Sequence, residues 1–294
     1  RDRSAPSDGL GAATRIPWST CTVGADDVRL PALVDLSLAD LRSLLMSDGD
    51  DHFLAAGSPW FMTLFGRDSL WAARFLLPLG TELALGTLRT LARRAGARPD
   101  VDSDEQPGRI LHEVRRTPHE LGTLALPPVY YGSVDSTPLW ICLLVDAWRW
   151  GAPAAEVEAL IPTLLAALVW MRDDGDADGD GFLEYVDRSG RGLGNQGWKD
   201  SFDSVQWADG RLADAPIALS EVQAYAYEAS TGAAQLLRAF GRPGADVPPP
   251  SSPGGGPSSA GWKISSTVPA RSAFIPASTL ATPNCTAVCT SWPQ

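Results

Sequence analysis

The sequence has few of the residues from which metal centres and disulfide scaffolds are built. It contains three histidines, His52, His112 and His119, and four cysteines in 294 residues. The histidines are scattered along the chain, so they form no recognisable metal-binding pattern. Four cysteines are too few for a disulfide framework in a chain of this length, and Cys142 lies in an apolar helical stretch that predicts a core residue.

The sequence also lacks an excess of positive charge and a long apolar run. Lys and Arg total 24 against 35 Asp and Glu, which gives a formal net charge of −11. This balance argues against a nucleic-acid partner and against an acidic membrane surface. No apolar run predicts a membrane span, and no signal peptide is recognised. We therefore expect a cytoplasmic protein without a nucleic-acid or membrane partner.

Strand signals are few, whereas helical patterns recur. Apolar residues at helical spacing predict helices over residues 36–46, 69–79, 81–95, 137–150, 153–171 and 216–240. Pro162 is expected to kink or split the fifth of these helices. A short strand is expected at most inside a loop, for example over residues 181–186. The sequence thus predicts an all-α fold class built from helical hairpins.

Residues 195–201 form the most informative segment. They place Asp200 two positions after Trp198 in a glycine-flanked loop. An aromatic wall raises the pKa of a carboxylic acid, which allows it to donate a proton near neutral pH. Aromatic faces also bind sugar rings, so the segment indicates glycoside chemistry. The chain has 11 Trp, which suits that chemistry, although a core position is the default interpretation for any one of them.

Polar motifs recur just before the second helix of each predicted hairpin. Arg67 and Asp68 precede the first of these helices, Asp135 precedes the second, and Asp200 lies ahead of the third. Their intervals along the chain are nearly equal, so each hairpin is expected to return the chain to the same rim of the fold. The three motifs would then line one pocket.

Three segments carry a resemblance to a known family. Residues 65–70, with the sequence Phe-Gly-Arg-Asp-Ser-Leu, resemble the Arg-Asp-Ser motif of glucoamylases. Residues 130–140 and 196–201 are similar to the bacterial-type amylo-α-1,6-glucosidases, or glycogen debranching proteins. That group belongs to the six-hairpin glycosidases, together with mannosylglycerate-hydrolase-like enzymes. The resemblance covers about residues 35–241.

The resemblance implies an (α/α) six-hairpin toroid, of which about the first three hairpins are present in a truncated chain. Residues 35–242 would form this partial glycosidase domain, and residues 1–34 would be a remnant of, or linker from, a preceding β domain. Residues 243–294 are poor in charge and rich in Pro, Gly, Ser and Thr, which predicts a disordered low-complexity tail or a non-native continuation. Helix faces left uncovered by the missing hairpins would favour self-association.

The resemblance also assigns roles to the polar motifs. Asp200 would be the general acid that protonates the glycosidic oxygen. Trp198 and Lys199 would shape the pocket of that acid. Arg67 and Asp68 would hydrogen-bond sugar hydroxyls, because a guanidinium fork and a carboxylate both suit a vicinal pair.

Each polar motif has a structural interpretation as well. Asp200 and Asp135 could each simply cap a helix. Arg67 and Asp68 could form an ion pair at a helix start, where the helix dipole favours the carboxylate. The family motifs favour the functional interpretation, and the recurring spacing favours substrate contact for Asp135.

Neighbouring aromatic and acidic residues complete the predicted site. Tyr130, Tyr131, Trp60 and Phe65 are candidates for stacking on sugar rings, with core packing as an equal alternative. Glu113 lies in a segment that resembles a recurrent family segment, and it joins the substrate-binding candidates without a defined role.

Residues 176–187 follow the spacing of an EF-hand calcium loop only in part. Asp176, Asp178 and Asp180 fit the first positions, but Asp187 stands where Glu is expected, and the following residues suggest a short strand. A solvated acidic turn is the favoured interpretation, and a calcium loop is the second. We assign no metal and no cofactor.

The resemblance implies a glycoside hydrolase that cleaves α-glucosidic bonds of an α-glucan or oligosaccharide by inversion, at the α-1,6 branches of glycogen-like glucans. An inverting enzyme pairs its acid with a second carboxylate that activates water. In the family this base is a Glu late in the toroid, and no residue of this chain matches it, so the chain could be inactive alone. Two alternatives stay open: a non-catalytic α-glucan-binding fragment, and a six-hairpin hydrolase of a small glycoside.

Overall fold

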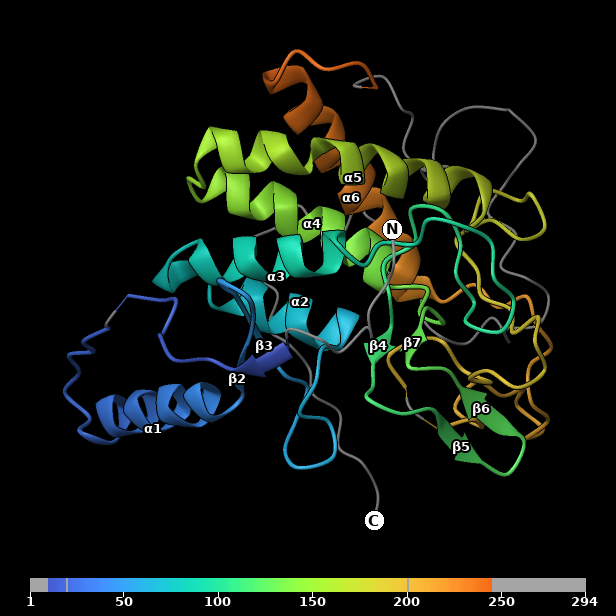
Figure 1. The fold of residues 1–294 in the computed structure, drawn as a ribbon, viewed down its shortest axis with the longest axis horizontal. Coiled ribbons are helices and arrows are strands. Elements are labelled where there is room, and N and C mark those ends of the chain that lie inside the picture. The colour runs from blue at the N-terminus through green and yellow to red at the C-terminus, as the bar shows by residue number, and fades with distance from the viewer. Residues whose placement is uncertain (1–9, 20, 200, 245–294) are drawn as a thin grey trace.

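The computed structural model describes residues 10–19, 21–199 and 201–244 of the chain (Figure 1). Six α-helices and one short 3₁₀ helix form within these ranges. They are α1 (Arg29–Ser43), α2 (Gly66–Phe75), η1 (Leu77–Leu79), α3 (Glu82–Ala92), α4 (Ser136–Arg149), α5 (Ala154–Asp173) and α6 (Ser220–Ala239).

Seven short strands form three small antiparallel sheets in the same part of the chain. The strands are β1 (Leu10–Ala12), β2 (Leu45–Asp48), β3 (Asp51–Leu54), β4 (Glu113–Val114), β5 (His119–Leu121), β6 (Leu124–Leu126) and β7 (Val129–Tyr130). β1, β2 and β3 pair in that order, β4 pairs with β7, and β5 pairs with β6.

The predicted all-α class is therefore wrong. The described residues combine helices with three small antiparallel sheets, and they form no six-hairpin toroid. Most of the strands lie in segments between helices, whereas β1 precedes α1 and β2 begins within the predicted helix over residues 36–46. Residues 181–186 contribute only an isolated bridge, between Tyr185 and Ile217.

The hairpin of β2 and β3 shows why the strand pattern was hidden. Apolar residues continue from α1 into β2 without a break, so helical spacing predicts a helix to residue 46, whereas α1 ends at Ser43. The turn itself indicates a hairpin. Gly49 is flanked by two aspartates, and a short apolar run lies on either side of them. Gly49 has a φ of 62°, which glycine adopts without strain and which suits a tight hairpin turn.

α4 is the centre of the helical body. It packs against α2, α3, α5 and α6, and Figure 1 shows α2, α3, α4 and α5 stacked one above another with α6 crossing behind. Trp140 is fully buried, and its Nε1 donates to the Leu88 carbonyl of α3 at 3.1 Å. Cys142 is buried, as predicted. The start of α4 is thereby fixed by several neighbours.

α5 is an apolar helix of 20 residues. Pro162 lies inside α5, which continues through it as one helix, so the predicted split does not occur. By length and composition alone α5 could cross a membrane, a property that the core helix of a soluble protein shares. Here α5 packs against α3, α4 and α6, with Val157 and Leu164 fully buried.

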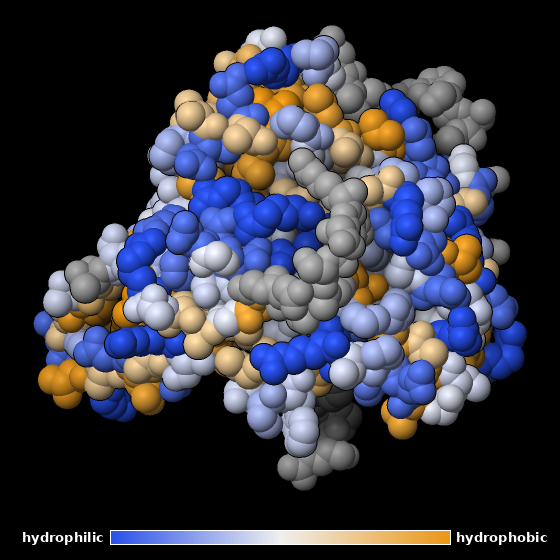
Figure 2. All heavy atoms as spheres, in the orientation of Figure 1, coloured by the Kyte–Doolittle hydropathy of each residue, from blue (hydrophilic) through white to orange (hydrophobic). Residues whose placement is uncertain are grey.

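α1 lies at one end of the molecule, beside β2 (Figure 1). None of its residues is buried, and Leu30, Leu33 and Leu36 are exposed. Figure 2 shows hydrophobic side chains gathered at this end. The predicted domain limit between residues 34 and 35 falls inside this helix.

Candidate functional site

A groove of about 740 Å³ lies between α2 and the loop that carries Trp198. Arg67, Asp68 and Trp198, three residues that the sequence assigns to one site, line it together. Its other lining residues are apolar or aromatic: Leu41, Leu44, Leu54, Ala55, Ala56, Trp71, Ala72, Phe75, Leu76 and Tyr225. A mostly apolar hollow with a few placed polar groups is typical of a ligand site.

The start of α2 brings Arg67 and Asp68 to the groove. Gly66 begins this helix, and no larger residue fits there. A Cβ atom on Gly66 would lie 2.2 Å from the carbonyl oxygen of Leu111 and 2.5 Å from Oγ of Ser136. The glycine therefore lets the first turn of α2 pack directly against the start of α4.

Arg67 and Asp135 form a nearly buried ion pair at this junction. Nη1 of Arg67 lies 2.8 Å from Oδ2 of Asp135, and their side chains are 12% and 2% exposed. The other oxygen of Asp135 accepts a hydrogen bond of 2.6 Å from Oγ of Ser133. Asp135 precedes α4 but makes no side-chain capping bond. Its carboxylate is thus placed to hold Arg67 in position, and it does not line the groove.

Asp68 is exposed and belongs to the first turn of α2. A carboxylate at this place interacts favourably with the dipole of the helix. Of the described residues that line the groove, Asp68 is the one with a carboxylate. Its exposed carboxylate can therefore accept hydrogen bonds from a ligand in the groove.

Gln196 anchors the loop between α5 and α6 that forms the second wall. Its side chain accepts from Nη2 of Arg109 at 2.9 Å and donates to Oδ2 of Asp104 at 3.1 Å. Its carbonyl accepts from the Val134 amide at 3.1 Å. Arg109 and Asp104 pair at 2.8 Å; burial lowers the pKa of Arg109 and raises that of Asp104, while their attraction opposes both shifts. The loop is thereby held beside the start of α4.

The segment that follows carries the predicted aromatic wall. Trp198 is 56% exposed, and Nζ of Lys199 lies 5.9 Å from its ring centroid. Asn195 secures the segment by donating to the Lys199 carbonyl and, at 2.6 Å, to Oγ of Ser204. Asp200, the predicted general acid, lies outside the described residues.

The groove contains three aromatic residues that the sequence motifs do not predict: Trp71, Phe75 and Tyr225. Trp71 stacks with Phe75 at a centroid distance of 5.4 Å and meets Tyr225 edge-on at 5.9 Å. Arg74 lies 5.3 Å from the Trp71 centroid. The available signal is the four-residue spacing of Arg67, Trp71 and Phe75, which places all three on one face of a helix.

Four other predicted substrate-binding residues are buried: Tyr130, Tyr131, Phe65 and Glu113. The hydroxyl of Tyr131 donates to a main-chain carbonyl at 2.8 Å, and that of Tyr130 accepts from a main-chain amide at 3.0 Å. Glu113 pairs with Arg115 at 2.8 Å. None of the four is among the residues that line the groove. In this structure they pack inside the molecule, which for the three aromatic residues is the alternative interpretation.

His112 lies within the same interior group. Its ring meets those of Phe65 and Tyr130 edge-on, at centroid distances of 5.6 and 6.1 Å. Nδ1 is buried without a hydrogen-bond partner. Burial, and then the charges of Arg67 and two other arginines, lower the pKa of His112 to about 3. The imidazole is therefore neutral in the folded protein near neutral pH.

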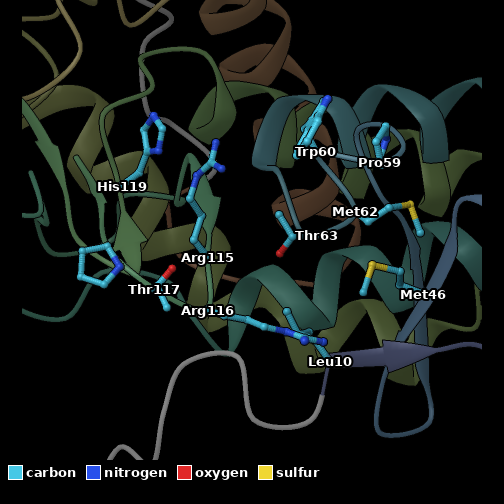
Figure 3. A pocket seen from close by; sticks show the side chains of 11 residues that line it. Leu10, Met46, Pro59, Trp60, Met62, Thr63, Arg115, Arg116, Thr117 and His119 are labelled. Carbon is cyan, nitrogen blue, oxygen red and sulfur yellow. The ribbon is translucent and has the colours of Figure 1, made fainter. Parts of the chain in front are cut away.

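A second hollow, of about 410 Å³, contains Trp60. Figure 3 shows Arg115 and His119 on one side of it and Trp60 and Pro59 on the other. Trp60 is 81% exposed. This predicted stacking residue therefore does not share the groove of Trp198.

A cluster of carboxylates that could hold a metal ion lies elsewhere in the described residues. Asp176, Asp178 and Glu184 form a cluster in the loop after α5, and none of them lines the groove. The groove itself offers hydrogen bonding by Arg67 and Asp68 and stacking on four aromatic rings.

A scan against models of protein families found no match to this chain, and a search of curated proteins found no relative.

Proposed function

We propose that the groove binds an oligosaccharide of glucose and that the chain is a glycoside hydrolase of α-glucosidic bonds, with α-1,6 branches of glycogen-like glucans as its substrate. Arg67 and Asp68 hydrogen-bond sugar hydroxyls, and Trp198 stacks on a sugar ring. Asp200 protonates the glycosidic oxygen. The proposal joins the sequence motifs to the chemistry of the groove.

The observation that carries the proposal is the meeting of Arg67, Asp68 and Trp198 in one hollow. A sugar ring presents hydroxyls at its edge and carbon-bound hydrogens on its faces. The groove offers both kinds of partner, because charged donors and acceptors lie beside aromatic rings. Asp135 adds to the binding by fixing the guanidinium of Arg67 before the ligand arrives.

Hydrolysis by inversion requires two carboxyl groups about 6.5–9.5 Å apart, so that a water molecule fits between the base and the sugar. Asp200 supplies the acid in this proposal. Asp68 is the one carboxylate among the described residues that line the groove. If Asp68 binds sugar hydroxyls, no residue of this lining is left to act as the base. This observation favours a second candidate function, the binding of an α-glucan without cleavage.

Binding is tested by calorimetric titration of the full chain with maltooligosaccharides and with a branched limit dextrin. Trp198→Ala should weaken binding at least tenfold, or about 1.4 kcal/mol, with little change in stability because Trp198 is largely exposed. Trp60→Ala is the matched control, since it removes an exposed indole from the other hollow. Equal affinities of the two variants would contradict the assignment of the groove.

Cleavage is tested separately, by release of glucose from the branched limit dextrin. Wild-type protein should release glucose, and Asp200→Asn should reduce the rate to background while keeping the affinity. A wild-type protein that binds the dextrin but releases no more glucose than Asp200→Asn would leave the non-catalytic function in place of the hydrolase.

A further inference from the structure

The loop after α5 carries a cluster of carboxylates that the proposed function does not use. Asp176, Asp178 and Glu184 each place a carboxylate oxygen within 4.8 Å of the other two. The three residues differ in exposure: Asp178 is exposed, Asp176 is half-buried and Glu184 is only 6% exposed. The cluster therefore has an inner and an outer side.

Glu184 distinguishes this cluster from a solvated acidic turn. Its Oε2 atom is buried and has no hydrogen-bond partner in the structure. A buried carboxylate oxygen is normally satisfied by a donor or by a cation. The three carboxylates also lie close enough together to repel one another. A cation among these oxygens would relieve both the burial and the repulsion.

Main-chain and side-chain bonds fix the loop around the cluster. The carboxylate of Asp176 accepts the amides of residues 179–181, at 2.7, 3.1 and 2.9 Å. Gln223 of α6 brackets Leu183, accepting from its amide at 2.9 Å and donating to its carbonyl at 2.8 Å. The residue before Glu184 is thus tied to a helix, which sets the position of the buried carboxylate.

The geometry points to a calcium site formed by Asp176, Asp178 and Glu184. Calcium takes six to eight oxygen ligands in flexible geometry, so main-chain carbonyls and water can complete the shell around three carboxylates. Magnesium demands near-ideal octahedral geometry, and zinc prefers nitrogen and sulfur ligands, which this cluster does not contain.

The site differs from an EF-hand loop. Glu184 takes the place that the EF-hand pattern would give to Asp187. The carboxylate of Asp187 instead accepts hydrogen bonds from residues 189 and 192, at 2.7–3.0 Å. The ligands therefore lie closer together in the sequence than the 12-residue pattern requires.

The calcium site would stabilise the wall of the groove. A hollow of about 10 Å³ is lined by Glu184 together with Asp104 and Arg109. Those last two residues hold Gln196, and the same loop continues to Trp198. An ion at Glu184 would order this loop whether or not the groove binds a sugar, so the inference does not rest on the proposed function.

The test is calorimetric titration of the metal-stripped full chain with calcium chloride, without any sugar. Wild type should bind one calcium ion, and its thermal unfolding temperature should rise with calcium. Glu184→Gln and Asp178→Asn should each weaken calcium binding at least tenfold. Asp178 is exposed, so its variant tests the site even if the buried substitution impairs folding.

Asp173→Asn is the matched control, because Asp173 is an exposed carboxylate at the end of α5 that pairs with Arg172. It should bind calcium as wild type does. The inference is overturned if wild type shows no binding at about 1 mM calcium. It is also overturned if Glu184→Gln and Asp178→Asn bind calcium as tightly as Asp173→Asn.

Discussion

His112 should make the stability of the protein depend on pH in a way that one substitution removes. Burial, and then the charge of Arg67, lower its folded-state pKa from 6.5 to about 3. Folding therefore favours the neutral imidazole, and the unfolded chain binds a proton that the folded chain does not. This contribution to stability is present in full above about pH 6.5 and is lost as the pH falls towards 3.

The size of the effect follows from the two pKa values. Between pH 7 and pH 5 the unfolded imidazole becomes almost fully protonated, while the folded imidazole stays neutral. Linkage between protonation and folding then lowers the free energy of unfolding by about 2 kcal/mol over this interval. Comparing wild type with a His112 variant at the same two pH values isolates the contribution of His112, because the other titrating groups are common to both proteins.

The assay is urea denaturation of wild type and His112→Phe at both pH values, followed by tryptophan fluorescence. Phenylalanine keeps an aromatic ring against Phe65 and Tyr130 but cannot titrate. The loss of stability on acidification should be about 2 kcal/mol smaller in His112→Phe than in wild type. His119→Phe is the control, because it removes an imidazole from a different place, the strand β5 that pairs with β6. Equal losses in wild type and His112→Phe would refute the reasoning.

The start of α2 and the two described cysteines lead to further expected results. Asp135→Ala should lower the free energy of unfolding by about 3–5 kcal/mol in urea denaturation, because it breaks the nearly buried ion pair with Arg67. Gly66→Ala should cost about 1–3 kcal/mol or more in the same assay, whereas Gly57→Ala, where a Cβ meets nothing within 4 Å, should cost little. Burial raises the pKa of the Cys142 thiol, so iodoacetamide should modify the partly exposed Cys21 in the native protein and Cys142 only after denaturation, as peptide mass spectrometry would show.

The long helices could be predicted from the sequence because their apolar positions repeat over several turns. α4, for example, lies at residues 136–149 where the pattern predicts 137–150. The fold class could not, since strands of two to four residues carry too little alternation to stand out between helices. β4 and β7, which contribute two residues each, are held by packing and pairing that a local pattern does not reveal.

The sequence predicts only part of the candidate site. Arg67 and Trp198 do lie in one groove, although the all-α toroid expected around them is not formed by the described residues. The burial of Asp135 could not be foreseen, because a sequence does not show which charged group an acid will take as its partner. Tyr130 and Tyr131 illustrate the same limit for aromatic residues, because a local pattern does not show which side chains the tertiary structure will bury.

Residues spaced regularly along α2 line the groove at fixed distances from one another. Arg67, Trp71 and Phe75 succeed one another at intervals of four residues, slightly more than one helical turn and about 6 Å along the axis. An extended ligand lying along this helix would meet a charge and then two rings in a fixed order, whereas Trp198 on the loop stands apart from that series. The helix would then set the order in which a ligand meets the charged group and the two rings.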